Sequence, residues 1–171
     1  YETDPKFSPR GRYVSFVRDR NLWVIELASG REYPVTRDGG GTVAYGMAEF
    51  VAQEEMDRST GYWWSPDEAR IAFARVDEAP VDEVERFEIL ADSVRVIRQR
   101  YPAAGRANAD VQLWVSRLTT AAAPVRIDTG TPADGYLARV DWFPDSAALA
   151  VQWQSRDQTQ LVLRRADPDT G

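Results

Sequence analysis

Histidine and cysteine are absent from the 171 residues, and lysine occurs once, as Lys6. Without an imidazole the chain cannot assemble a Ser-His-Asp triad, and without a thiol it can form neither a disulfide nor a cysteine nucleophile. The usual nitrogen and sulfur ligands of zinc are missing as well, and no carboxylates cluster in a metal-binding pattern. We therefore expect no catalytic residue, no metal site and no cofactor in this chain.

Basic charge and long apolar runs are also scarce. The 21 basic side chains are outnumbered by 27 acidic ones, which gives a net charge of -6 and the opposite of a nucleic-acid-binding surface. No segment approaches the roughly 20 apolar residues of a membrane span, and residues 1–5 lack the features of a signal peptide. The hydrophobic content of 43% is typical of a soluble globular protein. We expect a folded domain with neither a nucleic-acid partner nor a membrane span.

One sequence pattern occurs three times, in residues 7–16, 64–73 and 142–151. Each copy has an aromatic residue, a proline two positions later, a turn and a run in which apolar residues alternate. Alternation with a period of two is typical of a strand, and the proline favours the turn that leads into this strand. A small residue stands at the same offset in each copy, where it would let a neighbouring sheet approach closely: Ser15, Ala72 and Ala150. Further strand-like runs follow each copy, so the pattern predicts repeated antiparallel sheets.

Repeated antiparallel sheets of four strands are typical of β-propeller blades. The three prolines of the pattern are 57 and 78 residues apart, so insertions separate the copies. The blade-like units would cover residues 1–40, 62–128 and 136–171. Because a closed propeller needs about 4 to 8 blades, we predict an all-β fold in which residues 1–171 form about three four-stranded blades of one larger propeller domain.

Two insertions interrupt the predicted sheets. Good helix formers dominate the first, which predicts a short helix over about residues 47–59. The second, residues 77–110, fits a helical apolar stripe and also the alternation of an extended arm. The residues alone leave these two alternatives open.

Glu54 and Glu55 are the strongest candidate binding residues. On a helix, adjacent side chains point about 100° apart and can converge on one cation, whereas on a strand they point to opposite faces. Two carboxylates could accept hydrogen bonds from an ammonium group, which has three donors. The alternative is that both are solvated charges on a surface helix.

Three other features have simpler structural interpretations. Residues 39–41 are three glycines, but they lack the downstream Lys-Ser/Thr of a phosphate-binding loop and indicate a turn. Tryptophans at repeat-equivalent positions indicate packing between blades rather than carbohydrate stacking. Asp67 and Asp145 follow the repeated prolines and are explained by turn formation.

The order of motifs resembles the N-terminal propeller of the dipeptidyl peptidase IV family, especially its bacterial members. The resemblance rests on Gln53-Glu54-Glu55-Met56, on residues 62–67 (Tyr-Trp-Trp-Ser-Pro-Asp), on Ile71-Ala72-Phe73 and on residues 100–105 (Arg-Tyr-Pro-Ala-Ala-Gly). It implies a serine exopeptidase in which an α/β-hydrolase domain follows the propeller and dipeptides are released after proline or alanine. The gap between the Glu-Glu and Trp-Trp motifs is one residue shorter here than in vertebrate members.

The resemblance implies that Glu54 and Glu55 bind the free amino group of a peptide substrate. The nucleophile, its base, the oxyanion hole and an arginine from an earlier blade would lie outside this chain, which should therefore be inactive alone. The arm would consist of paired strands near Glu83–Ile89 and Val94–Arg100 and would form a homodimer of the full protein. A periplasmic or secreted location is implied as well.

Two other functions fit the same residues. One is a prolyl tripeptidyl peptidase, which shares the propeller and a similar glutamate pair. The other is a non-catalytic periplasmic propeller that binds proteins, with Glu54 and Glu55 as plain surface charges.

Overall fold

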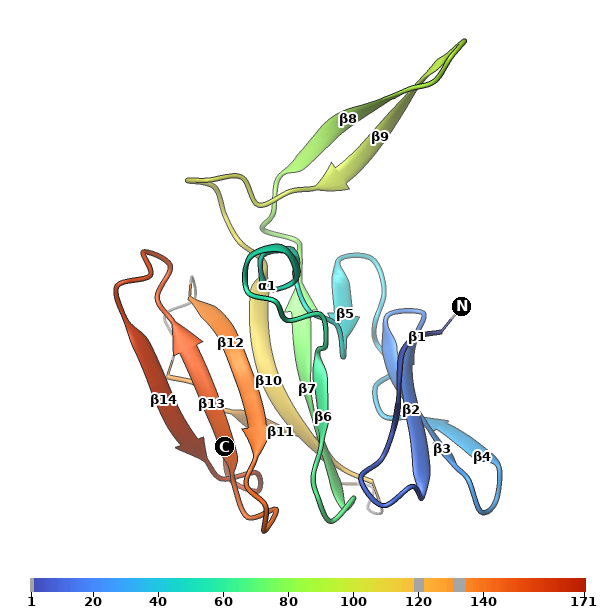
Figure 1. The fold of residues 1–171 in the computed structure, drawn as a ribbon, viewed down its shortest axis with the longest axis vertical. Coiled ribbons are helices and arrows are strands. Elements are labelled where there is room, and N and C mark those ends of the chain that lie inside the picture. The colour runs from blue at the N-terminus through green and yellow to red at the C-terminus, as the bar shows by residue number, and fades with distance from the viewer. Residues whose placement is uncertain (1, 119–121, 131–134) are drawn as a thin grey trace.

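A computed structural model describes residues 2–118, 122–130 and 135–171 of the chain. Three antiparallel sheets stand side by side, and a long hairpin projects away from them (Figure 1). The first sheet has the order β1-β2-β3-β4. Its strands are β1 (Thr3–Phe7), β2 (Tyr13–Arg18), β3 (Asn21–Glu26) and β4 (Arg31–Pro34).

The second sheet contains five strands, because its first strand is broken in two. β5 (Val43–Tyr45) and β6 (Tyr62–Trp64) both pair with β7 (Arg70–Asp77), one with each half of it. β7 also pairs with β10 (Asp110–Arg117), which pairs with β11 (Val125–Ile127). The two short strands therefore act as one, and the sheet corresponds to a four-stranded blade with an insertion in its first strand.

The third sheet has three strands within the described residues, in the order β12-β13-β14. They are β12 (Tyr136–Trp142), β13 (Leu149–Gln154) and β14 (Leu161–Ala166). With one short helix in the described part of the chain, α1 (Phe50–Glu55), the fold is all-β and matches part of a propeller. The predicted fold class is confirmed.

The insertion after β7 is an extended arm, not a helix. β8 (Glu83–Ile89) and β9 (Val94–Arg100) pair along their whole length and pair with no other strand of the described residues. Both ends of the arm rejoin the second sheet, at Asp77 and Asp110. The structure decides between the two alternatives that the sequence leaves open.

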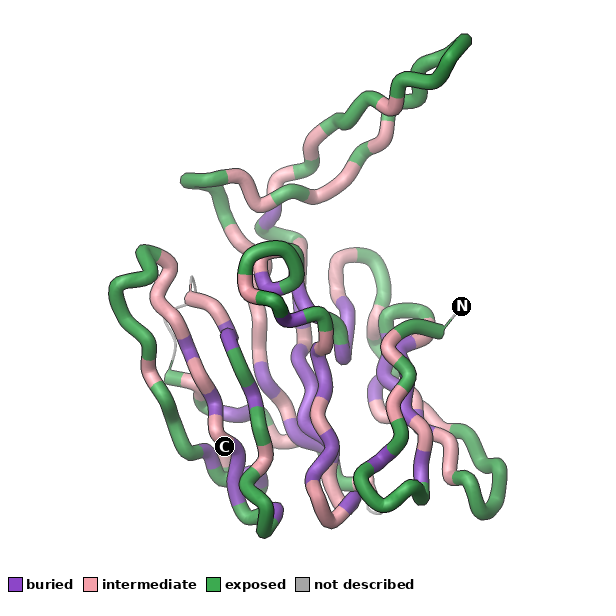
Figure 2. Tube along the Cα trace, in the orientation of Figure 1, coloured by how far each residue is buried: buried purple, intermediate pink, exposed green. Residues whose placement is uncertain are grey.

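The core lies between neighbouring sheets, as the buried central strands show (Figure 2). One apolar cluster joins the first and second sheets and includes Ile71 and Phe73 of β7. The other joins the second and third sheets and includes Ala72, which lies between these two residues in the sequence. Alternate residues of β7 therefore pack against opposite neighbours. The small side chain of Ala72 suits the side where Leu149 and Val151 of β13 fill the space.

The turn between the first and second strands of each sheet also links neighbouring sheets. Gly11, Glu68 and Ser146 occupy equivalent turn positions, and all three have a positive φ near 60–70°. Glu68 reaches back to the preceding turn, where its carboxylate accepts hydrogen bonds from the Ser8 hydroxyl and the Arg12 guanidinium. Ser146 makes the equivalent connection one blade later, where its hydroxyl oxygen accepts a hydrogen bond of 3.0 Å from the Asp67 backbone N–H.

Candidate functional site

Residues 47–60 leave the second sheet through the break between β5 and β6. Met47 and Thr60 form an isolated antiparallel bridge that closes this excursion at its base. Glycines flank it on both sides: Gly46 has a φ of +72°, and a Cβ atom at Gly61 would overlap the Met47 backbone. The excursion therefore starts and ends at one point of the strand.

Lys6, the single lysine of the chain, fixes the base of the excursion to the first sheet. Its ammonium donates to the Tyr62 carbonyl at 3.0 Å and to the Thr60 hydroxyl, and it lies 3.2 Å from the Asp4 carboxylate. Burial lowers the pKa of Lys6, and Asp4 opposes this shift. The excursion is thus held by two blades.

A buried ion pair joins the two ends of the helical part. The Arg58 guanidinium donates to Glu49 Oε2 at 2.9 Å, and both side chains are at least nine-tenths buried. The Arg58 backbone N–H also donates to the Ala52 carbonyl, and Ala52 is fully buried. Burial lowers the pKa of Arg58, Glu49 opposes the shift, and the charge of Arg139 adds to it. Because α1 has only six residues, these tertiary contacts and not helix propensity set its direction.

Glu54 and Glu55 lie at the C-terminal end of α1, and both are exposed. Glu55 lines an open cavity of about 780 Å³, whereas Glu54 is not among the lining residues. The ring of Phe50, in the first turn of α1, meets the Tyr101 ring edge-on at 5.2 Å. The structure therefore brings the Glu-Glu motif together with the segment that follows the arm, two of the motifs that carry the sequence resemblance.

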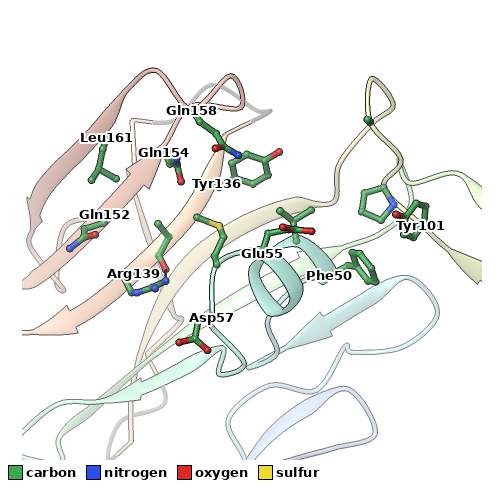
Figure 3. A pocket seen from close by; sticks show the side chains of 15 residues that line it. Phe50, Glu55, Asp57, Tyr101, Tyr136, Arg139, Gln152, Gln154, Gln158 and Leu161 are labelled. Atoms are coloured by element: carbon green, nitrogen blue, oxygen red, sulfur yellow. Dashed lines mark hydrogen bonds between the residues drawn. The ribbon is translucent and has the colours of Figure 1, made fainter.

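The cavity lies between α1, the segment after the arm and the third sheet. Figure 3 shows Glu55 on the helix, with Phe50 and Tyr101 on one side and Arg139, Gln152 and Gln154 of β12 and β13 on the other. Asp57 also lines it. Its walls thus carry two carboxylates, and Arg139 is the one basic side chain among the described residues that line it. Such a mixed wall can bind a ligand that carries both a cation and polar groups.

The other sequence candidates have structural roles. The side-chain oxygen of Asn21 accepts a hydrogen bond of 2.9 Å from the Gly39 backbone N–H, which holds the glycine run in a loop. Trp64 stacks on Tyr13 at 5.6 Å between the first two sheets, and Trp142 donates to the Trp63 carbonyl between the next two. The carboxylates of Asp67 and Asp145 accept backbone N–H bonds within their own turns, from Ala69 and Ala147.

The whole chain matches a known family. The model of the dipeptidyl peptidase IV (DPP IV) N-terminal region matches residues 1–171. The chain belongs to this family. The resemblance noted from the Glu-Glu, Trp-Trp-Ser-Pro and Tyr-Pro motifs is thereby confirmed.

The chain is also similar to individual members of the dipeptidyl peptidase family. The chain is 30% identical over 170 residues to a probable dipeptidyl peptidase 4 of Emericella nidulans, an alignment that spans 92% of this chain and 22% of that protein. The crystal structure of Porphyromonas gingivalis dipeptidyl peptidase 4 superposes with a TM-score of 0.90 at 30% identity, over 98% of this chain and 24% of that one. A putative dipeptidyl aminopeptidase IV from Bacteroides ovatus gives a TM-score of 0.82 at 27% identity, over 99% and 23%. The chain thus spans about a quarter or less of these relatives.

Sequence reasoning missed the cavity wall opposite the helix. Arg139, Gln152 and Gln154 carry no recognised motif and lie about 80 to 100 residues after the glutamates. One signal was present: Leu137 and Val140 are both apolar but three residues apart, which breaks the alternation of a strand.

No described helix is long and apolar enough to cross a membrane.

Proposed function

We propose that this chain is the substrate-gating part of a serine exopeptidase and that Glu54 and Glu55 bind the free α-amino group of a peptide. The observation that carries the proposal is the position of Glu55, which is exposed at the wall of an open cavity on a helix fixed by a buried ion pair. Membership of the dipeptidyl peptidase IV family supports the reaction class. The substrates would be peptides from which X-Pro or X-Ala dipeptides are released.

The chemistry of the proposal is recognition by charge. An ammonium group can donate to two carboxylates at once, and each charge-assisted bond is stronger than a neutral one. An α/β-hydrolase domain of the full-length chain would supply the nucleophile, its base and the oxyanion hole. Anchoring the amine at a fixed distance from that nucleophile would determine which peptide bond is cut. A peptide without a free amine would leave these carboxylates without the ammonium, which penalises it.

Blocking the amine tests this function. The full-length protein is expected to hydrolyse an X-Pro anilide with a free N-terminus at least about 30-fold faster, in kcat/KM, than the same compound after N-acetylation, because a charge-assisted contact is lost. Mass spectrometry of the released peptide distinguishes dipeptide from tripeptide release. Equal rates for the free and acetylated compounds would contradict amine binding, and no hydrolysis at all would favour a non-catalytic propeller.

We further propose that the arm binds a second copy of the full protein. Phe87, Ile89, Val94 and Val96 form cross-strand pairs on one face of the hairpin tip, and each is about half exposed or more. An isolated two-stranded hairpin is marginally stable in water, so its exposed apolar face indicates a partner. The family resemblance favours another copy of the same chain. It also underlies our proposal of a periplasmic or secreted location, which cell fractionation tests.

A charge on this face should prevent the association. Phe87→Glu in the full-length protein is expected to convert a dimer to a monomer in light scattering coupled to size exclusion, because a buried unpaired carboxylate is costly at an interface. Arg86→Ala, on the opposite face of the same strand, is the matched control and should remain dimeric. A wild-type protein that is monomeric at micromolar concentration would refute the role of the arm.

A further inference from the structure

The strand β12 contains a bulge that determines where Arg139 points. The register between β12 and β13 shifts between Leu137 and Arg139. Leu137 and Val140 belong to the same core cluster although they are three residues apart, a spacing that places residues on opposite faces of a regular strand. The bulge resolves this conflict. Arg139, next to Val140, consequently lies on the face away from the core, where it is exposed and lines the cavity. Bulges that direct one side chain in this way are common beside functional sites.

The side chains around Arg139 have hydrogen-bonding groups without partners among the residues that the structure describes. Gln152, Gln154 and Gln158 also line the cavity, and no side-chain hydrogen bond within the described residues involves any of the three. Arg139 donates one bond, of 2.8 Å, to the carbonyl of its neighbour Ala138, and it forms no ion pair with a described carboxylate. By contrast, ten of the thirteen ion pairs between described residues join another arginine to a carboxylate within 3.6 Å. One wall of the cavity therefore offers a guanidinium without an ion pair to a described carboxylate and three amides without a side-chain hydrogen bond to a described residue.

We propose that Arg139 is a specificity residue that binds a carboxylate side chain on the N-terminal residue of the peptide substrate. This inference rests on the proposed binding of the substrate amine by Glu54 and Glu55. Glu55 and Arg139 line the same cavity from opposite walls (Figure 3), so a residue anchored by its ammonium at Glu55 can extend its side chain toward Arg139. The wall then favours N-terminal Glu or Asp, whose charge complements the guanidinium, and disfavours N-terminal Lys or Arg.

The expected selectivity follows from the strength of such pairs. A guanidinium presents donors in a geometry that matches both oxygens of a carboxylate. A hydrogen bond to a charged group contributes about 1.5 to 3 kcal/mol, which corresponds to about a 10- to 160-fold change in kcat/KM. The neighbouring glutamines can share the ligand, because an amide both donates and accepts.

The test compares three substrates that differ only in the first residue. With the full-length protein, kcat/KM is measured for Glu-Pro, Gln-Pro and Lys-Pro anilides. The wild-type protein is expected to prefer Glu-Pro over Lys-Pro by about 10-fold or more. Arg139→Gln should reduce that ratio to near one, mainly through slower hydrolysis of Glu-Pro, and Arg139→Glu should reverse it. Arg10→Gln, which removes the same charge from the exposed turn after β1, is the matched control and should retain the wild-type ratio.

The outcomes separate this inference from the proposed function. If N-acetylation abolishes hydrolysis but the Glu-to-Lys ratio is unchanged in both Arg139 variants, amine binding stands and the role of Arg139 is wrong. If both variants lose activity equally toward all three substrates, Arg139 is not a specificity residue, and the inference is overturned too. If the full-length protein releases no dipeptide from any substrate, the proposed function fails and this inference fails with it.

Discussion

Replacing Glu55 by glutamine in the full-length protein is expected to lower kcat/KM for dipeptide release by about 30- to 1,000-fold, equivalent to about 2 to 4 kcal/mol. The reason is chemical: glutamine has nearly the same size as glutamate, but its amide carries no charge, and only its carbonyl oxygen can accept a hydrogen bond from an ammonium. Because Glu55 is exposed and contributes nothing to the buried core, the fold should be unaffected.

The N-acetylated substrate provides an internal control for this variant. If Glu55 acts on the ammonium, the substitution should hardly change the already slow hydrolysis of the acetylated compound, because that compound has no charge to lose. A double-mutant cycle of residue and substrate then isolates the interaction between them. Glu83→Gln, which removes a carboxylate at the base of the arm and outside the cavity, should leave both rates at their wild-type values. An equal loss for free and acetylated substrates would show that Glu55 acts by some other route.

The second large effect is expected on stability, from Glu68→Gln. The Glu68 side chain is fully buried, and its carboxylate accepts bonds from the Ser8 hydroxyl, the Arg10 backbone N–H and the Arg12 guanidinium. A glutamine would place an NH₂ group against at least one of these donors. We expect the free energy of unfolding to fall by about 2 to 3 kcal/mol. Urea unfolding of the chain, followed by tryptophan fluorescence, measures the change. The exposed substitution Glu83→Gln is again the control.

The same carboxylate makes stability depend on pH. Burial by itself raises the pKa of Glu68, but the hydrogen bonds from Ser8, Arg12 and the Arg10 backbone outweigh burial and lower the pKa from 4.5 to about 2. A lowered pKa means that folding favours the ionised form. The stabilisation is therefore complete above about pH 4.5 and is lost as the pH falls toward 2. Glu68→Gln should be less sensitive to pH than the wild type across this window. A parallel decline of the two proteins would contradict the assignment.

The sheets were predictable from the sequence because their signals are local. A proline turn followed by alternating apolar residues marks β2, β7 and β13, and equivalent small residues indicate close packing between sheets. The division of the first strand of the second sheet into two short strands could not be predicted in the same way. β5 has only three residues, and sixteen residues separate it from β6, so no local pattern shows that the two short strands complete each other.

The candidate site was predictable only in part. The adjacent glutamates were found, and α1 lies inside the predicted segment of residues 47–59, but the helix has only six residues. Its length is set by tertiary contacts such as the pair of Glu49 and Arg58, which hydrophobic periodicity does not encode. Arg139 reaches the cavity through a bulge, and a bulge changes the face of a side chain without any residue type that identifies it. The arm was ambiguous because short apolar runs fit both periods.

The break in the first strand of the second sheet separates the pairing of that strand from the sequence of the segment inserted into it. Because the excursion leaves at Gly46 and returns at Gly61 to the same strand, the ladder to β7 continues on either side of it. Its length and sequence can change without breaking this ladder, and the entropic cost of closing a longer loop grows slowly with loop length. Evolution can therefore alter the position and number of the exposed carboxylates here while the blade itself is inherited unchanged. Within this family we therefore expect sequence and length to diverge more in residues 47–60 than in the strands of the sheets.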